Sequence, residues 1–392
     1  MYKYKFILNF LRLVLVVASL CTILLPKSIA HAPHRVKFQL SKPYININLE
    51  VNTGFSSSSS ASATPTSTAL FLPLSPMTTQ TPAILTWSPP HCGDATHGCG
   101  NYYITESGRG HQFLGPDILD VSKDWRVHLP AHRPQVGGID IDGGHNVIII
   151  GGEIDLTTPC KTDNDVCHGI NISRNASARG EVYIEGVLIK NPDTTHTKYT
   201  GDGIDVNTST TSNITLQNIR VEGIDGCDAN GNSAHADVFQ PYGATNSVLH
   251  VDHLTGTSDF QGMEVPPDLT SPRSGTYKNV NMDMLSNSHS GCKSSSHYGW
   301  WLAKDANTCT MYPTSLLNTY EKEPSGSLAS NAVWPDKNIT FGCPANYSNG
   351  KATWPTIANI SGSITNGFPP GGDFVPSGVA GISYVSPGYQ TS

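Results

Sequence analysis

Acidic side chains recur in three short segments in the middle of the chain. The segments are Gly201–Asp205 (GDGID), His235–Gln240 (HADVFQ) and Gln261–Val265 (QGMEV). Carboxyl and imidazole groups donate and accept protons near neutral pH, so such groups on neighbouring segments can act as general acid and base. We therefore predict one catalytic group, formed by Asp205, His235, Asp237 and Glu264.

A repeated apolar spacing indicates how these segments are positioned. Apolar or small residues at +0, +2, +5 and +7 return every thirty-odd residues, as expected for two alternating strands that meet at a bend. Units of this length stack on one another and bury a continuous core, which predicts a β-solenoid. The four repeats are Val147/Ile149/Gly152/Ile154, Val182/Ile184/Val187/Ile189, Ile214/Leu216/Ile219/Val221 and Leu249/Val251/Leu254/Gly256.

A second set of short strands precedes the bends. The segments 139–141, 170–172, 204–206, 238–240, 263–265 and 300–302 each follow a Gly or Asp and align without gaps. Because side chains alternate across a strand, the middle residue is expected to point outward. This alignment places Gln240 inward. The predicted outward column is Asp140, Asn171, Asp205, Phe239, Glu264 and Trp301.

Several of these segments resemble a known superfamily. The stretches 140–144 (DIDGG), 201–206 (GDGIDV) and 213–218 (NITLQN) are similar to the right-handed parallel β-helix of the pectate-lyase-like superfamily, over roughly residues 125–285. The resemblance implies an all-β, single-stranded solenoid and a polysaccharide ligand. Members include lyases, hydrolases, epimerases and phage tailspike proteins, so the fold alone does not choose an activity.

The chain departs from the polygalacturonase pattern within that superfamily. The Asp-Asp pair, the Gly-His-Gly segment and the Arg-x-Lys segment are all absent from residues 125–285. The catalytic residues of that family therefore cannot be transferred. The His-x-Asp of His235 and Asp237, followed by Gln240 and Tyr242, resembles uncharacterised secreted β-helix proteins.

The first hypothesis is glycoside hydrolysis by a carboxyl pair. Two strand spacings of ~4.8 Å would separate Asp205 from Glu264, which overlaps the ~6.5–9.5 Å expected of inverting enzymes. Glu264, beside apolar neighbours, would be the acid, and either Asp205 or Asp237 would activate water. His235 would orient these groups or stabilise charge.

Two alternatives use the same surface differently. A polysaccharide lyase would hold Ca²⁺ through Asp202, Asp205 and Asp237, with Arg273, Lys278 or Lys304 as the base. A non-catalytic glycan-binding module would instead use exposed aromatic planes. The expected substrate-binding residues are Phe239, Tyr242, Trp301 and Arg273.

The chain divides into three predicted regions. Residues 1–32 are typical of a secretory signal peptide, with early positive charge, an apolar stretch and the small-x-small Ala30-His31-Ala32. Residues 33–82 are expected to be an extended, disordered linker rich in Ser, Thr and Pro. Residues 83–392 would be the β-helix, with a first strand at 124–129 and an irregular cap from about 312. A secreted protein without stable membrane insertion follows.

Composition excludes one class of partner. The formal charge is −7, and the 24 Lys and Arg residues form no basic run, so no nucleic-acid partner is expected. Of the nine cysteines, Cys21 lies in the signal peptide. The remaining even number predicts disulfides. The close pairs are Cys92/Cys99 and Cys160/Cys167. Oligomeric state is left open.

Overall fold

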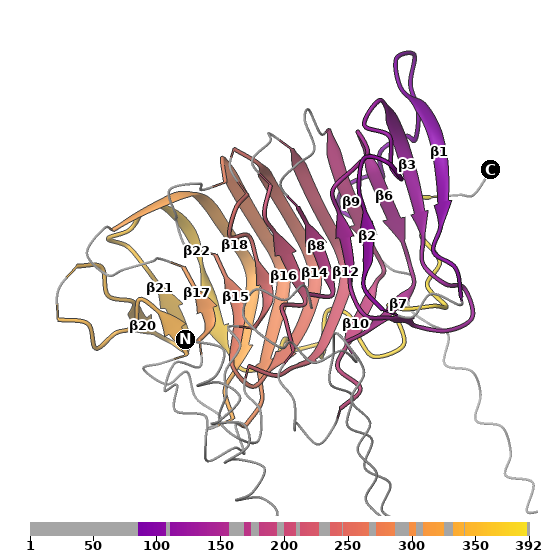
Figure 1. Cartoon of the computed structure of the whole chain (residues 1–392). Coiled ribbons are helices and arrows are strands. Elements are labelled where there is room, and N and C mark those ends of the chain that lie inside the picture. The colour runs from indigo at the N-terminus through magenta and orange to yellow at the C-terminus, as the bar shows by residue number, and fades with distance from the viewer. Residues whose placement is uncertain are drawn as a thin grey trace, which may run out of the picture. The chain divides into compact units, whose positions relative to one another are not determined.

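The structure is a computed structural model, and its regular structure within the described residues is entirely β-strand (Figure 1). Residues 85–389 are described, except 107–109, 157–167, 174–179, 194–199, 209–211, 227–235, 245, 266–271, 287–297, 303–308, 325–331 and 341. The predicted signal peptide (1–32) and linker (33–82) lie outside this part. No helix in the described part is long and apolar enough to span a bilayer.

The larger sheet contains 14 strands, and the order along its main path follows the chain for nine of them. Neighbours pair in parallel, except where β20 and β21 turn back as antiparallel strands near the end. The main path is β1 (Gly98–Tyr103), β3 (Lys123–His128), β6 (Val147–Ile150), β9 (Glu181–Glu185), β12 (Asn213–Ile224), β14 (Val248–Ser258), β16 (Ser274–Met284), β18 (Thr310–Lys322), β22 (Ala358–Asn366), β21 (Lys351–Thr353) and β20 (Asn346–Ser348), with β4 (Gln135–Val136), β7 (Glu153–Asp155) and β10 (Leu188–Lys190) beside it.

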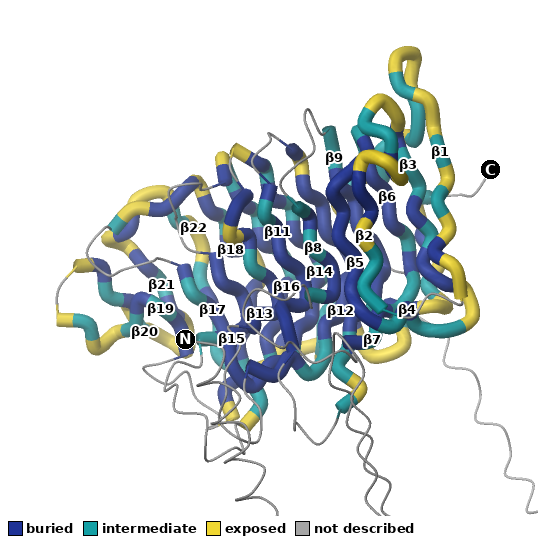
Figure 2. Tube along the Cα trace, in the orientation of Figure 1, coloured by how far each residue is buried: buried dark blue, intermediate teal, exposed yellow. Residues whose placement is uncertain are grey.

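The smaller sheet contains eight strands, all paired in parallel. Along the chain, each of its strands is followed by one to three strands of the larger sheet, so the chain alternates between the two. The buried core clusters along both sheets (Figure 2). The eight strands are β2 (Gln112–Leu114), β5 (Ile139–Ile141), β8 (Ile170–Ile172), β11 (Ile204–Val206), β13 (Asp237–Gln240), β15 (Gln261–Glu264), β17 (Tyr298–Trp301) and β19 (Val333–Trp334).

The register of the larger sheet confirms the predicted repeat. The first residues of the four repeats pair in sequence: Val147 with Val182, Val182 with Ile214, and Ile214 with Leu249. All four are buried. The predicted first strand at 124–129 corresponds to β3, although β1 precedes it. Equivalent residues therefore stack at every repeat, so each strand continues the core of the one before.

The bend within each repeat is made by residues in the left-handed region. Gly186, Asn218, His253 and Asn279 have φ between 51° and 71°. Gly and Asn tolerate this conformation better than other residues. The Asn279 amide also donates to Asp252 Oδ1 at 2.7 Å, which ties one bend to the repeat before it.

One predicted alignment in the smaller sheet is wrong by a single residue. Ile204 pairs with Phe239 and Asp205 with Gln240, so Phe239 points inward and Gln240 outward. Phe239 is 0% exposed and meets Tyr277 edge to face. The physical reason is that Val238 stands opposite Gly203 of the neighbouring strand. The inward position opposite Ile204 is therefore taken by the next residue, Phe239. Stacking of Phe239 on a sugar is therefore excluded.

The irregular cap expected from about residue 312 is also wrong at its start. Residues 310–322 form β18, which pairs with β16 in the repeat register. Its inward positions include Thr314, Thr319 and Glu321, all buried. These polar residues conceal the apolar spacing that marks the other repeats.

The C-terminal segment after β22 lies against the outer side of the larger sheet. The Tyr384 hydroxyl donates to Glu185 Oε1 at 2.6 Å, and Asn218 Nδ2 donates to that hydroxyl at 3.1 Å. Arg220 Nη1 donates to Asp373 Oδ2 at 2.8 Å and to the Val375 carbonyl at 2.6 Å. The segment therefore adds hydrogen bonds to polar groups on this side of the sheet, which also have partners on the sheet itself.

Removal of the Tyr384 hydroxyl should destabilise the fold. Glu185 is 0% exposed, so Tyr384→Phe leaves one buried carboxylate oxygen without its donor. We expect a loss of about 1–3 kcal/mol in the free energy of unfolding, measured by urea denaturation. Tyr103→Phe, at an exposed tyrosine, is the matched control. Equal stability of the two variants would contradict this role.

Candidate functional site

A row of side chains runs across the smaller sheet, on the face opposite to the side chains that point into the core. Register pairs Asp140 with Asn171, Asn171 with Asp205, and Asp205 with Gln240. Glu264 continues the row, because Gln240 Nε2 donates to Glu264 Oε2 at 2.7 Å. We call this the outer row; it consists of Asp140, Asn171, Asp205, Gln240, Glu264, Trp301 and Trp334.

A second row, formed by His168, Asp202 and Asp237, lies beside it at the start of the same strands. Asp237 N donates to Asp202 Oδ1 at 2.8 Å, and His168 Nδ1 lies 3.0 Å from Asp202 Oδ2. The Asp237 carboxyl lies close enough to Glu264 for the two groups to influence each other's charge. The two rows therefore meet. We call their four acidic residues, Asp202, Asp205, Asp237 and Glu264, the acidic cluster.

Burial sets the protonation of this cluster. Asp205 is 6% exposed, and burial raises its pKa to about 7, with the charges of Asp202 and Asp140 adding to the shift and His168 opposing it. Asp205 Oδ1 has no hydrogen-bond partner among the described residues. The group is therefore poised to exchange a proton near neutral pH.

The pKa values of Asp237 and His168 are also raised. Burial, with the neighbouring charge of Glu264, raises the pKa of Asp237 well above its usual range. Burial by itself lowers the pKa of His168, but the hydrogen bond and charge of Asp202 outweigh it and raise the value to about 9. Asp237 therefore favours its protonated form beside Glu264, and at pH 7 His168 is a cation paired with Asp202.

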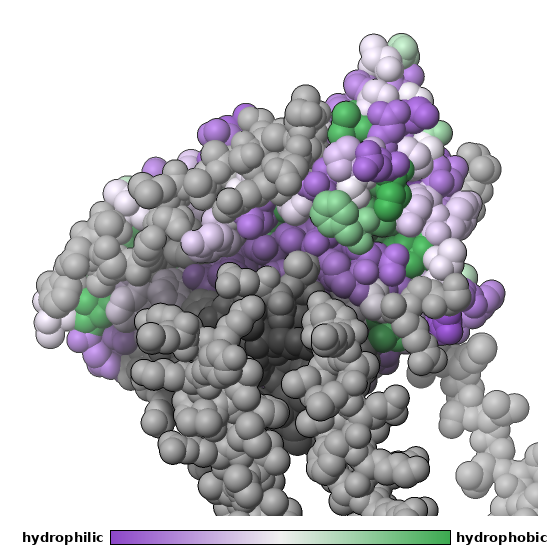
Figure 3. Space-filling model, viewed as in Figure 1, coloured by the Kyte–Doolittle hydropathy of each residue, from purple (hydrophilic) through white to green (hydrophobic). Residues whose placement is uncertain are grey.

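Aromatic side chains continue the outer row beyond the carboxyl groups. Glu264 pairs in register with Trp301, and Trp301 with Trp334. The ring centroids of Tyr298 and Trp301 lie 5.4 Å apart, and those of Tyr298 and Trp334 lie 5.6 Å apart. We call Tyr298, Trp301 and Trp334 the aromatic cluster; all three are half-buried. Where described atoms are visible, the surface in this view is mainly hydrophilic across its middle (Figure 3).

The predicted site residues divide into three groups. Asp202, Asp205, Asp237 and Glu264 come together in the acidic cluster, and Trp301 lies next to it. Tyr242 is 54% exposed in the turn after β13, whereas Arg273 is exposed just before β16 of the larger sheet. His235 lies outside the described residues, as does the candidate base Lys304.

The sequence did not predict His168 and Trp334 as site residues, and it placed Gln240 on the wrong face of its strand. A signal for His168 was present, because His168-Gly169-Ile170 aligns with Asp202-Gly203-Ile204. No such signal exists for Trp334, because the apolar repeat spacing is not visible in the sequence from β18 onward.

The three residues proposed as calcium ligands, Asp202, Asp205 and Asp237, lie together in the acidic cluster. Asp202 Oδ1 accepts a backbone hydrogen bond and Asp202 Oδ2 faces His168. The pKa of Asp237 is raised by burial and by the charge of Glu264, which favours the uncharged form over the carboxylate that Ca²⁺ prefers.

Three comparisons with known proteins, against family models, curated proteins and solved structures, found no match. The function of this chain is therefore inferred from the residues of the acidic and aromatic clusters.

Proposed function

We propose that this chain is a secreted right-handed parallel β-helix, similar to the pectate-lyase-like superfamily, that hydrolyses a polysaccharide. Alternation of the chain between two parallel sheets in constant register supports the solenoid. Crossovers between parallel strands of one sheet are right-handed in almost all proteins, which supports the handedness. The Cys92–Cys99 and Cys309–Cys343 disulfides are compatible with an oxidising compartment.

The observation that carries the proposal is the buried acidic cluster adjoining the aromatic cluster on one row of a parallel sheet. Hydrolysis of a glycosidic bond needs one carboxyl group that holds a proton and one that is ionised. The Asp237–Glu264 pair supplies the proton, and Asp205 supplies the group that ionises near neutral pH.

In this mechanism each group has one role. Glu264 delivers the shared proton to the glycosidic oxygen, because it is 8% exposed whereas Asp237 is 0% exposed. Asp205, one strand beyond Gln240, accepts a proton from the attacking water. The Asp202 carboxylate, held in place by His168, stabilises the positive charge that develops on the sugar.

The aromatic cluster supports a sugar polymer as the substrate. Trp301 and Trp334 offer apolar ring surface in line with Glu264, where adjoining sugar rings of a bound chain would stack. The net negative charge of the acidic cluster favours neutral sugars over uronates.

A polysaccharide panel tests the function. The purified protein is incubated with plant, algal and microbial polysaccharides, with calcium or with chelator, and both reducing ends and the absorbance of unsaturated uronates are followed. Reducing ends without that absorbance are the expected result. Absorbance that disappears with chelator would establish a calcium-dependent lyase instead. Retention of a polysaccharide without either signal would identify a glycan-binding module, which the aromatic cluster could also serve.

The pH dependence of kcat/KM follows from the acidic cluster. Asp205 must be ionised to act as the base, so activity should decline below about pH 7, approaching a tenfold loss per unit. The alkaline limb should lie higher, where the Asp237–Glu264 pair loses its proton. A profile that stays flat from pH 5 to pH 8 would contradict the role of Asp205 as base.

A further inference from the structure

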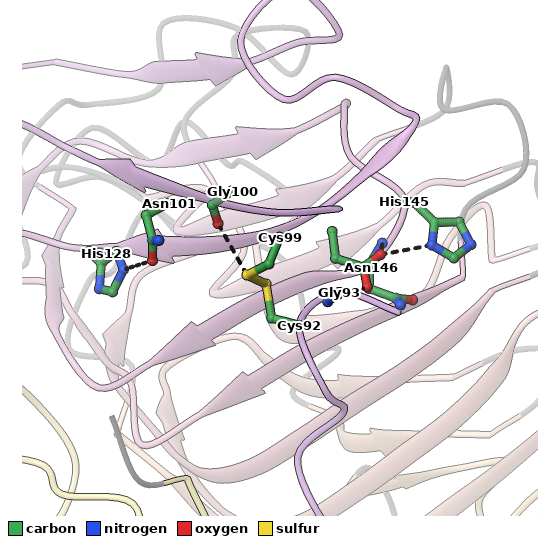
Figure 4. The surroundings of a disulfide bond; sticks show 9 residues. Cys92, Gly93, Cys99, Gly100, Asn101, His128, His145 and Asn146 are labelled. Carbon is green, nitrogen blue, oxygen red and sulfur yellow. Dashed lines mark hydrogen bonds and ion pairs between the residues drawn. A yellow bond between two sulfur atoms is a disulfide. The ribbon is translucent and has the colours of Figure 1, made fainter. Parts of the chain in front are cut away.

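A second group of chemically capable side chains lies on the larger sheet, outside the acidic cluster. His97 belongs to the loop that the Cys92–Cys99 disulfide closes, Asp124 lies in β3, and His145 directly precedes β6. One donor atom from each of the three residues lies within 4.8 Å of the other two. Figure 4 shows the disulfide with Gly93, Asn146 and His145 around it.

The carboxylate of this group is held ionised inside the protein. Asp124 is 1% exposed and accepts hydrogen bonds from Gly93 N at 2.9 Å, Asn146 N at 3.1 Å and His145 Nδ1 at 2.9 Å. Burial alone would raise the pKa of Asp124, but these hydrogen bonds outweigh it and lower the value. A fixed negative charge therefore lies beside the two imidazoles.

The two imidazole rings are parallel and in contact. Their centroids lie 3.7 Å apart with an interplanar angle of 7°. His97 Nδ1 lies 2.8 Å from Thr96 Oγ1 and 3.3 Å from Asp94 Oδ1, and His145 Nδ1 contacts Asp124. His97 is thus oriented through Nδ1 by oxygen partners outside the group, which is the usual support for a metal-ligating histidine, whereas the Nδ1 partner of His145 is Asp124 itself.

A metal ion binds the neutral form of imidazole. Two imidazoles and one carboxylate form a donor set suited to zinc or copper rather than calcium. In a tetrahedral zinc site the donors lie about 3.3 Å apart, because Zn–N distances are about 2.0 Å. The donor atoms of His97, Asp124 and His145 lie within 4.8 Å of one another, so side-chain rotations would have to bring them closer around the ion.

We propose that His97, Asp124 and His145 bind one divalent transition-metal ion, of which Zn²⁺ is the representative. The ion would join the disulfide-closed loop to β3 and β6 at the first strands of the larger sheet. A fourth coordination position would remain for water or another ligand.

Zinc titration of the purified chain, first stripped with chelator, tests this site. Isothermal titration calorimetry at pH 7.5 measures Zn²⁺ binding, and the melting temperature is recorded with and without the metal. Cobalt substitution provides an absorption spectrum that reports the coordination geometry. We expect His97→Ala to weaken the tightest Zn²⁺ binding by at least about 100-fold and to abolish the zinc-dependent rise in melting temperature.

Two controls separate metal binding from folding. His97 lies on a surface loop, so His97→Ala should melt like the parent protein when no metal is present. His128→Ala, on the same strand as Asp124, removes an exposed imidazole that pairs with Asn101 and should leave zinc binding unchanged. Zinc affinity that is equal in the parent, His97→Ala and His128→Ala proteins would overturn the proposal, as would the absence of binding at 100-fold molar excess of Zn²⁺.

Discussion

Glu264→Gln is expected to reduce kcat on the polysaccharide substrate by about 10²–10⁴-fold, with a much smaller change in KM. The amide retains the shape of the side chain and its contact with Gln240, but it cannot carry the proton shared with Asp237. Asp237→Asn should cause a similar loss, because it removes the other half of the pair. Steady-state kinetics on the substrate found in the polysaccharide panel measures both.

Glu106→Gln is the matched control, since Glu106 is an exposed glutamate outside the acidic cluster. It should retain parental kcat and KM. A loss of less than tenfold in both Glu264→Gln and Asp237→Asn would exclude this carboxyl pair from the reaction. If one variant lost activity through misfolding, its melting temperature would fall as well, and the kinetic comparison would be restricted to the variant that remains folded.

Asp205→Asn is expected to make the protein more stable at pH 8, although it is expected to abolish activity. The pKa of Asp205 is about 7 in the folded chain against an ordinary value of 3.8. Between these values the folded state binds more protons than the unfolded state, so stability falls as pH rises from about 4 to about 7. The amide of the Asp205→Asn variant does not ionise, so the variant does not lose stability in this way. We expect its free energy of unfolding at pH 8 to exceed that of the parent by about 3 kcal/mol, or roughly 6 °C in Tm.

His168 adds to the decline at higher pH. Its raised pKa of about 9 contributes stability that is complete below its ordinary value of 6.5 and is lost as pH rises through about 9. Thermal melts of the parent and of Asp205→Asn from pH 4 to pH 9 should therefore diverge up to about pH 7 and then fall together. Asp117→Asn, at an exposed aspartate, should track the parent protein throughout. Parallel curves for the parent and Asp205→Asn would show that Asp205 ionises without cost.

The repeat was predictable from sequence because it depends on which residues are apolar. The spacing that joins Val182 to Ile214 and Leu249 is reproduced by the strand register, since equivalent residues must stack to continue the core. The acidic residues Asp205 and Glu264 were predictable for a related reason: once the inward residues are known, their neighbours face out.

The misassigned positions share another cause. The order of inward and outward residues on β13 depends on Val238 occupying a position held by glycine on other strands, and apolar character alone does not show this. The continuation of the repeat through β18 was hidden because its inward positions are polar and become buried only against neighbouring strands. A period-two pattern changes face with a one-residue shift, so such errors exchange exposed and buried roles.

The sequence by itself determined the all-β class, the period of the repeat and the acidic residues, because each follows from residue type and spacing along one strand. Only the tertiary structure decided which groups are close enough to share a proton. Asp237 and Glu264 lie on successive strands, His168 pairs with Asp202 across another strand gap, and the His97 loop meets His145 across two more. Side-chain direction and burial set these distances and protonation states, and both arise when the strands pack.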